Sequence, residues 1–193
     1  MKQIYWFISI NEIMETIYKL PLPDVLCSKI ALYAFKSPHS DLCIGRLKTC
    51  LKDTSILKQD HDQEVKYMSI TSSNLLNAYI PLYYCACFTR LLSLTLSYTG
   101  VHGDICELKL IPSLMHLYLG GTQVQGNIEE LTSLRMLQSI YLFRTRVNGN
   151  INCLQDLPHL TGMNLHNTNV IGDEEQFQRY RSQHKLKKCN LYT

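Results

Sequence analysis

The sequence predicts a mixed α/β solenoid, a stack of similar units that each contribute one short strand. Three observations lead to this prediction. Columns of identical residues recur at one fixed interval, apolar residues alternate over a few positions in each unit, and their spacing then changes to three. The chain has 193 residues and is 46% hydrophobic, which is enough apolar material for one domain with a substantial core.

The repeat has a step of 23 residues. Its unit reads LxxLxLxxTxVxGxIxxLxxI, and four successive copies keep the same phase. The threonine column consists of Thr99, Thr122, Thr145 and Thr168, and the glycine column consists of Gly103, Gly126, Gly149 and Gly172. Valine and leucine columns follow the same step, which indicates a repeat architecture.

Each part of the unit has a structural interpretation. The alternation LxL predicts a short strand with one apolar face, and the spacing of three after the glycine predicts a helical or 3₁₀ return. One unit cannot bury its apolar face alone, whereas stacked units share a core. We expect the glycines to adopt positive φ in a turn, and the threonine hydroxyls to satisfy backbone groups there.

The first apolar residue of each unit, valine in the first unit and leucine in the others, sets the repeat boundaries. The sequence thus predicts units at 65–90, 91–113, 114–136, 137–159 and 160–185, with a partial unit at 186–193. In the partial unit, Cys189 and Leu191 are predicted to take the places of Met163 and Leu165. The array then has five or six parallel strands that line a slightly curved wall, with atypical units at both ends.

The pattern resembles the leucine-rich repeat family, and in particular its plant-type consensus LxxLxLxxNxLxGxIPxxLxxLxx. The resemblance covers residues 65–193. Threonine replaces the usual asparagine, and Cys106, Glu129 and Asn152 replace the proline that follows isoleucine. The resemblance implies a non-enzymatic module that recognises a protein partner on a preformed strand wall. The paired-cysteine cap of extracellular members is missing, which argues against a secreted receptor ectodomain.

Residues 1–64 lack the repeat and are predicted to be helical, with a polar linker at 58–64. One interpretation is a cap that covers the first repeat. The stretch LPLPDVL at 20–26 also resembles the start of an F-box, so residues 20–57 are alternatively a docking segment, and the protein a substrate adaptor of a ubiquitin ligase. A third interpretation is a structural subunit of a larger complex.

Positions between the inward leucines face outward and form columns on the wall. Aromatic residues and arginine are enriched in interface hot spots, so the middle of the wall is the predicted partner-binding site. The site comprises Tyr98, His116, Tyr118, Tyr141, Phe143, Arg144 and His166. Alternatively, the N-terminal segment or a loop covers Phe143. A second candidate surface, for an anionic partner, comprises Arg179, Arg181, Lys185, Lys187 and Lys188.

Composition and motifs argue against other classes. The net charge of +3 does not favour nucleic acid, and without a GxSxG, P-loop or HExxH motif we predict neither an enzyme nor a cofactor. The eight cysteines form no CxxC pair and no four metal ligands group together, so we expect free thiols and no metal. Without a signal peptide or a run of about 18 apolar residues, we expect a cytoplasmic or nuclear protein, either a monomer or part of a hetero-complex.

Overall fold

The computed structural model describes residues 57–59, 65–70, 80–86 and 88–192. Of residues 1–64, the structure describes only Leu57–Gln59, which form a strand. The helical prediction is therefore wrong at Leu57, and the first two residues of the predicted linker are also in this strand. The F-box-like stretch at 20–26 also lies outside the described residues.

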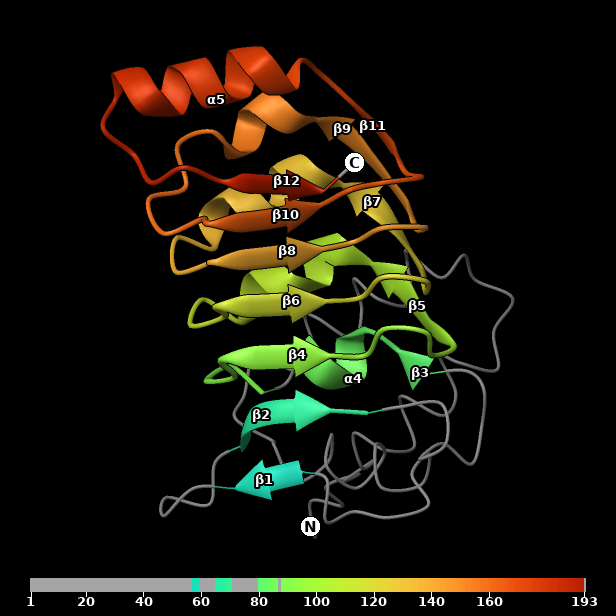
Figure 1. The fold of residues 1–193 in the computed structure, drawn as a ribbon. Coiled ribbons are helices and arrows are strands. Elements are labelled where there is room, and N and C mark those ends of the chain that lie inside the picture. Colours follow the sequence, from blue (N-terminus) through green and yellow to red (C-terminus); the bar gives the residue numbers. More distant parts are fainter. Residues whose placement is uncertain (1–56, 60–64, 71–79, 87, 193) are drawn as a thin grey trace, which may run out of the picture.

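Seven strands form the first sheet, in the order β1-β2-β4-β6-β8-β10-β12 (Figure 1). The six strands from β2 to β12 are parallel to one another, which confirms the predicted array, and β1 adds an antiparallel edge. The strands are β1 (Leu57–Gln59), β2 (Val65–Ser69), β4 (Ser93–Thr95), β6 (His116–Tyr118), β8 (Ser139–Tyr141), β10 (Gly162–Asn164) and β12 (Asn190–Tyr192).

A second sheet follows the threonine turns and was not predicted. Its five strands have the order β11-β9-β7-β5-β3, and Figure 1 shows it beside the first sheet along the same stack. The strands are β3 (Ile80–Pro81), β5 (Val101–Asp104), β7 (Gln123–Asn127), β9 (Arg146–Asn150) and β11 (Asn169–Ile171). Each unit between residues 91 and 172 thus supplies two strands, one to each sheet.

The return segments are helical, as predicted. The first described return segment is a short α-helix, the next three are 3₁₀ helices, and the last is a longer α-helix. In chain order, the five segments are α4 (Tyr83–Ala86), η2 (Ile105–Leu110), η3 (Ile128–Ser133), η4 (Ile151–Leu154) and α5 (Glu174–Gln183). A side-chain oxygen caps the N-terminus of each of the last four, because the residue before the helix accepts a bond from a backbone N–H. These capping residues are Asp104, Asn127, Asn150 and Asp173.

Gly103, Gly126 and Gly149 lie inside strands of the second sheet, and Gly172 directly follows β11. The predicted place in a turn is therefore wrong for the first three, although the predicted positive φ is confirmed for all four. Gly126 shows the reason. Its φ is +115°, and a Cβ atom there would lie 2.4 Å from Oδ1 of Asp104, the capping oxygen of the preceding unit. Gly149 has the same relation to Asn127, at 2.3 Å. The glycines therefore leave room for the column of capping side chains.

The threonine column confirms the predicted hydroxyl contacts. Oγ1 of Thr99, Thr122 and Thr145 each donates to the carbonyl oxygen three residues earlier at 2.6 Å, and Thr168 does so at 2.7 Å. These bonds close the turn between the two sheets in each of these four units.

The buried columns form one continuous core from Val65 to Cys189. The predicted inward and outward faces are correct for β4 to β10, since the central residue of each strand is buried. The last strand differs from the prediction. Leu191, rather than Cys189, pairs with Met163, which places Tyr192 beside Asn164. The reason is that α5 and the chain after it depart from the 23-residue step.

Candidate functional site

A row of aromatic side chains crosses the outward face of the first sheet. The ring centroids of Tyr118 and Tyr141 lie 5.0 Å apart, and those of Tyr141 and Tyr192 lie 5.8 Å apart. His116 stacks on Tyr118 at 6.3 Å with an angle of 14° between the rings. Parallel pairing places Tyr118 of β6 directly beside Tyr141 of β8. Tyr192 of β12 lies two strands from Tyr141, with Asn164 of β10 between them in the register.

Two further aromatic residues lie over the turns that follow the strands. The ring centroids of Tyr98 and Phe143 are 5.6 Å apart. Phe143 covers Gly120 so closely that a Cβ there would lie 2.2 Å from the Phe143 ring, and Tyr98 covers Gly121 in the same way at 2.7 Å. The unit between them therefore needs two glycines, because the neighbouring rings occupy the space that its side chains would fill.

The turn residue before each threonine has a left-handed backbone. The φ angles are +58° at Tyr98, +69° at Gly121, +54° at Arg144 and +56° at Asn167. Tyrosine and arginine rarely adopt this conformation, which costs on the order of 1–3 kcal/mol for a residue other than glycine. The turn thus holds the Tyr98 and Arg144 side chains outward, and Tyr98 is 62% exposed.

The structure brings together five of the seven predicted site residues in two ring clusters. His116, Tyr118 and Tyr141 form one cluster, and Tyr98 and Phe143 form the other. The remaining two, Arg144 and His166, are exposed in the next positions along the wall. The Arg144 N–H donates to the His166 carbonyl at 2.8 Å, so the backbones of these two turns are joined.

Sequence reasoning missed Tyr192, which is 49% exposed and extends the tyrosine row. The step of 23 residues cannot place it, because it follows the irregular last unit. The capping column was also missed, although Asp104, Asn127, Asn150 and Asp173 do recur at that step.

The wall is aromatic and carries no carboxylate in the described part of its strand columns. Burial and a hydrogen bond to Tyr192 raise the pKa of Tyr141, so its phenol stays neutral at physiological pH. The basic groups near the row are Arg144 and the two imidazoles of His116 and His166. Such a face offers aromatic surface, hydroxyl groups and one fixed positive charge.

The second candidate surface differs from the prediction at one position. Arg181 is fully buried and contributes no surface charge. Arg179 forms an ion pair with Glu175, at 2.8 Å between Nη2 and Oε1. Lys185, Lys187 and Lys188 remain exposed after α5, so the basic surface is smaller than predicted.

The described cysteines are free, as predicted for them. Cys85 and Cys189 are buried, while Cys106 and Cys153 are half-buried. Cys27, Cys43, Cys50 and Cys87 lie outside the described residues. Burial raises the pKa of Cys106 to about 12, with a further contribution from its contact with Asp104, and raises the pKa of Cys153 and Cys189 to about 11. These thiols are therefore poor nucleophiles at neutral pH.

Within the described residues, no three His, Cys, Asp or Glu side chains gather closely enough to hold a metal ion. No helix in this part of the chain has the length and apolar composition needed to cross a membrane.

Comparison with known proteins supports the fold. No protein-family model matches the chain, and no curated protein matches it. Among solved structures, the leucine-rich repeat ectodomain of the receptor kinase SOBIR1 from Arabidopsis thaliana has a TM-score of 0.58 and 19% identity. That match covers 79% of this chain and 90% of the other. Pollen Receptor Kinase 3 has a TM-score of 0.53 and 17% identity, with 66% and 71% of the two chains covered.

A structure of PEPR1 with AtPEP1 is similar in both fold and sequence. Its TM-score is 0.54 and its identity is 28%; the match covers 67% of this chain but only 18% of the matched chain. This chain therefore spans less than a fifth of that protein. Solenoids of this kind present extended concave surfaces to their partners. By its 23-residue repeat and its two-sheet solenoid, the chain has the leucine-rich repeat fold.

Proposed function

We propose that this protein binds a protein or peptide partner on the outward face of its first sheet, without catalysis. The aromatic row and the Tyr98–Phe143 pair are the contact surface. One observation carries the proposal: five aromatic rings and one imidazole lie in two adjoining contact clusters on a wall whose described strand columns contain no carboxylate. Aromatic residues and arginine supply most of the binding free energy in interface hot spots.

The rigidity of the wall favours binding. Parallel pairing holds the rings in the tyrosine row, and the threonine bonds hold the turns that carry Tyr98 and Arg144. A preformed surface loses little conformational entropy when a partner docks. Six parallel strands at a spacing of about 4.8 Å make a wall about 25 Å wide, which suits a peptide, a loop or a short helix.

The comparisons support the same class of partner. The structure of PEPR1 with AtPEP1 is 28% identical to this chain over the matched region, and it pairs a protein of this fold with a second named component. The positive charge of Arg144, with no carboxylate in the described strand columns of the wall, favours a partner segment that is neutral or acidic.

The test compares three forms of the full chain as bait in a lysate of its source. The double variant Tyr141→Ala/Phe143→Ala removes part of both clusters. The control Gln125→Ala/Asn148→Ala changes two exposed residues of the second sheet. We expect partners bound by the wild type and the control to be lost from the wall variant, and the melting temperatures to stay within a few degrees of one another, since neither wall residue is fully buried.

Retention of the same partners by a folded Tyr141→Ala/Phe143→Ala variant would contradict the proposal. Unfolding of that variant would mean that the rings hold the fold together rather than serve recognition. Titration of the recovered partner against each form would then measure how much affinity the wall supplies.

A further inference from the structure

The C-terminal end of the array is covered over only part of its cross-section. In the interior, Leu142 and Val147 are fully buried because the next unit packs over them. Leu165 and Val170 occupy the same places in the last unit, yet both are only half-buried. Helix α5 lies across this end of the stack (Figure 1), packs on η4 and buries Phe177, but it leaves Leu165 and Val170 only half-buried.

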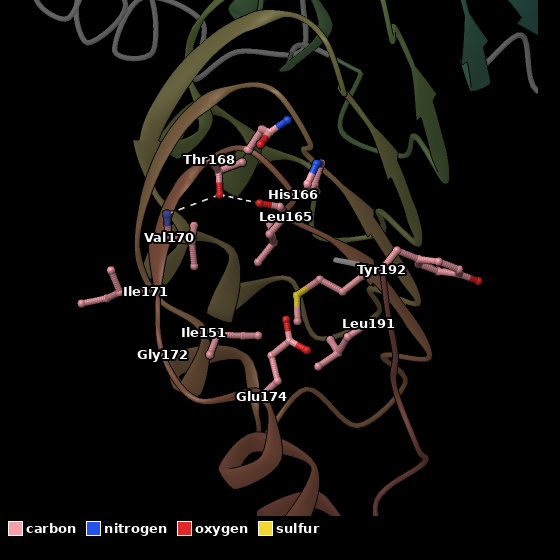
Figure 2. A pocket seen from close by; sticks show the side chains of 12 residues that line it. Ile151, Leu165, His166, Thr168, Val170, Ile171, Gly172, Glu174, Leu191 and Tyr192 are labelled. Carbon is pink, nitrogen blue, oxygen red and sulfur yellow. Dashed lines mark hydrogen bonds between the residues drawn. The ribbon is translucent and has the colours of Figure 1, made fainter.

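A pocket of about 260 Å³ lies beside these two residues, on the open side of this end between β11 and β12 (Figure 2). Its apolar lining consists of Ile151, Met163, Leu165, Val170 and Leu191. The volume is below the range of about 300–1,000 Å³ that is usual for small-molecule sites. The pocket therefore suits one or two inserted side chains better than a cofactor.

The strand beside the pocket has an edge that pairs with no other strand in the described part of the chain. β11 pairs with β9 on one side and ends the second sheet on the other. The Val170 N–H donates a long hydrogen bond to Oγ1 of Thr168, with 3.3 Å between nitrogen and oxygen (Figure 2). Ile171 points away from the pocket at this edge, and at 69% its exposure is the highest of any large hydrophobic residue described. An exposed, apolar strand edge is a template for pairing with another strand.

The carboxylates around the pocket favour an occupant with a positive charge. Figure 2 shows the Glu174 side chain directed into the opening, and Asp173 and Glu175 flank it in the chain. His166 is the only basic residue in the lining. The exposed lysines follow the far end of α5, which is about 15 Å long at 1.5 Å per residue. A positive charge on the occupant would therefore meet the carboxylates.

A second copy of the chain fits this end less well. If two copies met end to end, α5 of one could lie over the open side of the other. The outer face of α5 is polar, however, with Glu175, Arg179, Ser182 and Gln183 exposed. Those side chains would bury no apolar surface against Val170.

We propose that the open side of the C-terminal end binds an extended basic segment of a partner protein. The segment adds as a strand to β11, inserts an aliphatic side chain into the pocket, and places an arginine or lysine near Glu174. Main-chain bonds would supply part of the affinity, and the pocket and the carboxylate would supply the selectivity. This surface is separate from the aromatic wall.

The chain itself provides two matched probes. A fluorescein-labelled peptide with the sequence of residues 140–149, IYLFRTRVNG, has the leucine and valine spacing of a stacked unit and two arginines. The peptide of residues 117–126, LYLGGTQVQG, has the same spacing and no charge. We expect the full chain to bind the first peptide more tightly by about two- to fivefold, as for an exposed ion pair. The variant Ile171→Ser, which removes the apolar side chain without adding a charge, should weaken binding about tenfold, equivalent to ~1.4 kcal/mol.

Two further variants separate the contributions. Glu174→Lys should abolish the preference for the arginine-containing peptide. The matched control Met136→Ser changes an exposed apolar residue on another loop and should change neither affinity. The proposal is overturned if neither peptide binds, if Ile171→Ser binds as well as the wild type, or if Tyr141→Ala/Phe143→Ala abolishes binding instead. Dimerisation of the chain that Ile171→Ser prevents, measured by sedimentation, would identify a second copy as the occupant and also overturn it.

Discussion

Arg181 is the residue whose replacement should destabilise the end of the array most. Its guanidinium is fully buried, and all five of its N–H groups donate to main-chain carbonyls. Nε donates to Lys187 at 3.0 Å, Nη1 to Gln155 at 2.8 Å and to Leu157 at 2.9 Å, and Nη2 to Leu160 and Lys187, each at 2.8 Å. One side chain on α5 thus connects the loop before β10 to the loop before β12.

The expected cost follows from these contacts. The variant Arg181→Met keeps most of the side-chain volume but removes the guanidinium donors of four carbonyl oxygens. Among them, the Leu157 carbonyl still accepts from the Leu160 N–H at 3.4 Å. Each buried acceptor left without a partner costs about 1–3 kcal/mol, and entry of water would recover part of that cost. We therefore expect the free energy of unfolding to fall by about 3–5 kcal/mol. The variant Arg181→Lys should lose less free energy of unfolding than Arg181→Met but should still be less stable than the wild type. The reason is that an ammonium has three donors and cannot reach all four oxygens.

Urea denaturation of the full chain, followed by circular dichroism, measures this loss. Arg179→Ala is the matched control, since Arg179 lies on the same helix in an exposed ion pair with Glu175 and should cost less than about 0.5 kcal/mol. A loss below about 1 kcal/mol for Arg181→Met, or equal losses for the two variants, would refute the argument. Hydrogen exchange should show that protection is lost first in α5 and β12.

Three further predictions concern the repeat. Gly126→Ala should destabilise the protein by about 2–4 kcal/mol, because alanine is strained at φ +115° and its Cβ would meet Oδ1 of Asp104; urea denaturation measures this. Thr122→Val should cost about 1–2 kcal/mol in the same assay, since the Leu119 carbonyl loses its hydroxyl donor. Cys106 should react slowly with iodoacetamide at pH 8.5 in the folded chain, because its pKa is raised from 9.0 to about 12, and the unfolded chain should react far faster.

Each of these predictions has a control. Gly162→Ala places a Cβ at an ordinary 3.6 Å from the Tyr141 hydroxyl, so it should cost much less than Gly126→Ala, and equal costs would contradict the argument. Thr122→Ser keeps the hydroxyl and should retain most of the stability. Rapid alkylation of Cys106 in the folded chain, as judged by peptide mass, would show that its surroundings do not suppress the thiolate.

The raised thiol pKa values also predict how stability depends on pH. A thiol whose pKa is higher in the folded chain ionises first in the unfolded chain, so alkaline pH favours unfolding. For Cys189, whose pKa rises from 9.0 to about 11, this contribution to stability is present below pH 9 and is lost as the pH rises toward 11. The variant Cys189→Ala should lose less stability than the wild type over that interval.

The sequence alone is enough to predict the repeat, the first sheet and most of the wall. Each unit contacts its neighbours in a solenoid, so residues that share a phase in the sequence share a column in space. The 23-residue step therefore predicts that Tyr118 and Tyr141 lie side by side, and the pairing of β6 with β8 confirms it. The threonine contacts are predictable for a related reason, since they lie within one turn of each unit.

Only the tertiary structure decided those contacts that the 23-residue step does not predict. The glycine at position 126 predicted a positive φ. Only the pairing of β7 with β9 shows that Gly126 lies in a second sheet rather than in a turn. The basic run in the sequence predicts that Arg181 is a surface charge. In the structure it is buried, because four carbonyls at the end of the array accept its N–H groups. Tyr192 joins the wall through a strand whose register follows from how α5 packs on η4. A repeat determines the contacts between equivalent residues, whereas contacts at its irregular end depend on packing that no sequence period encodes.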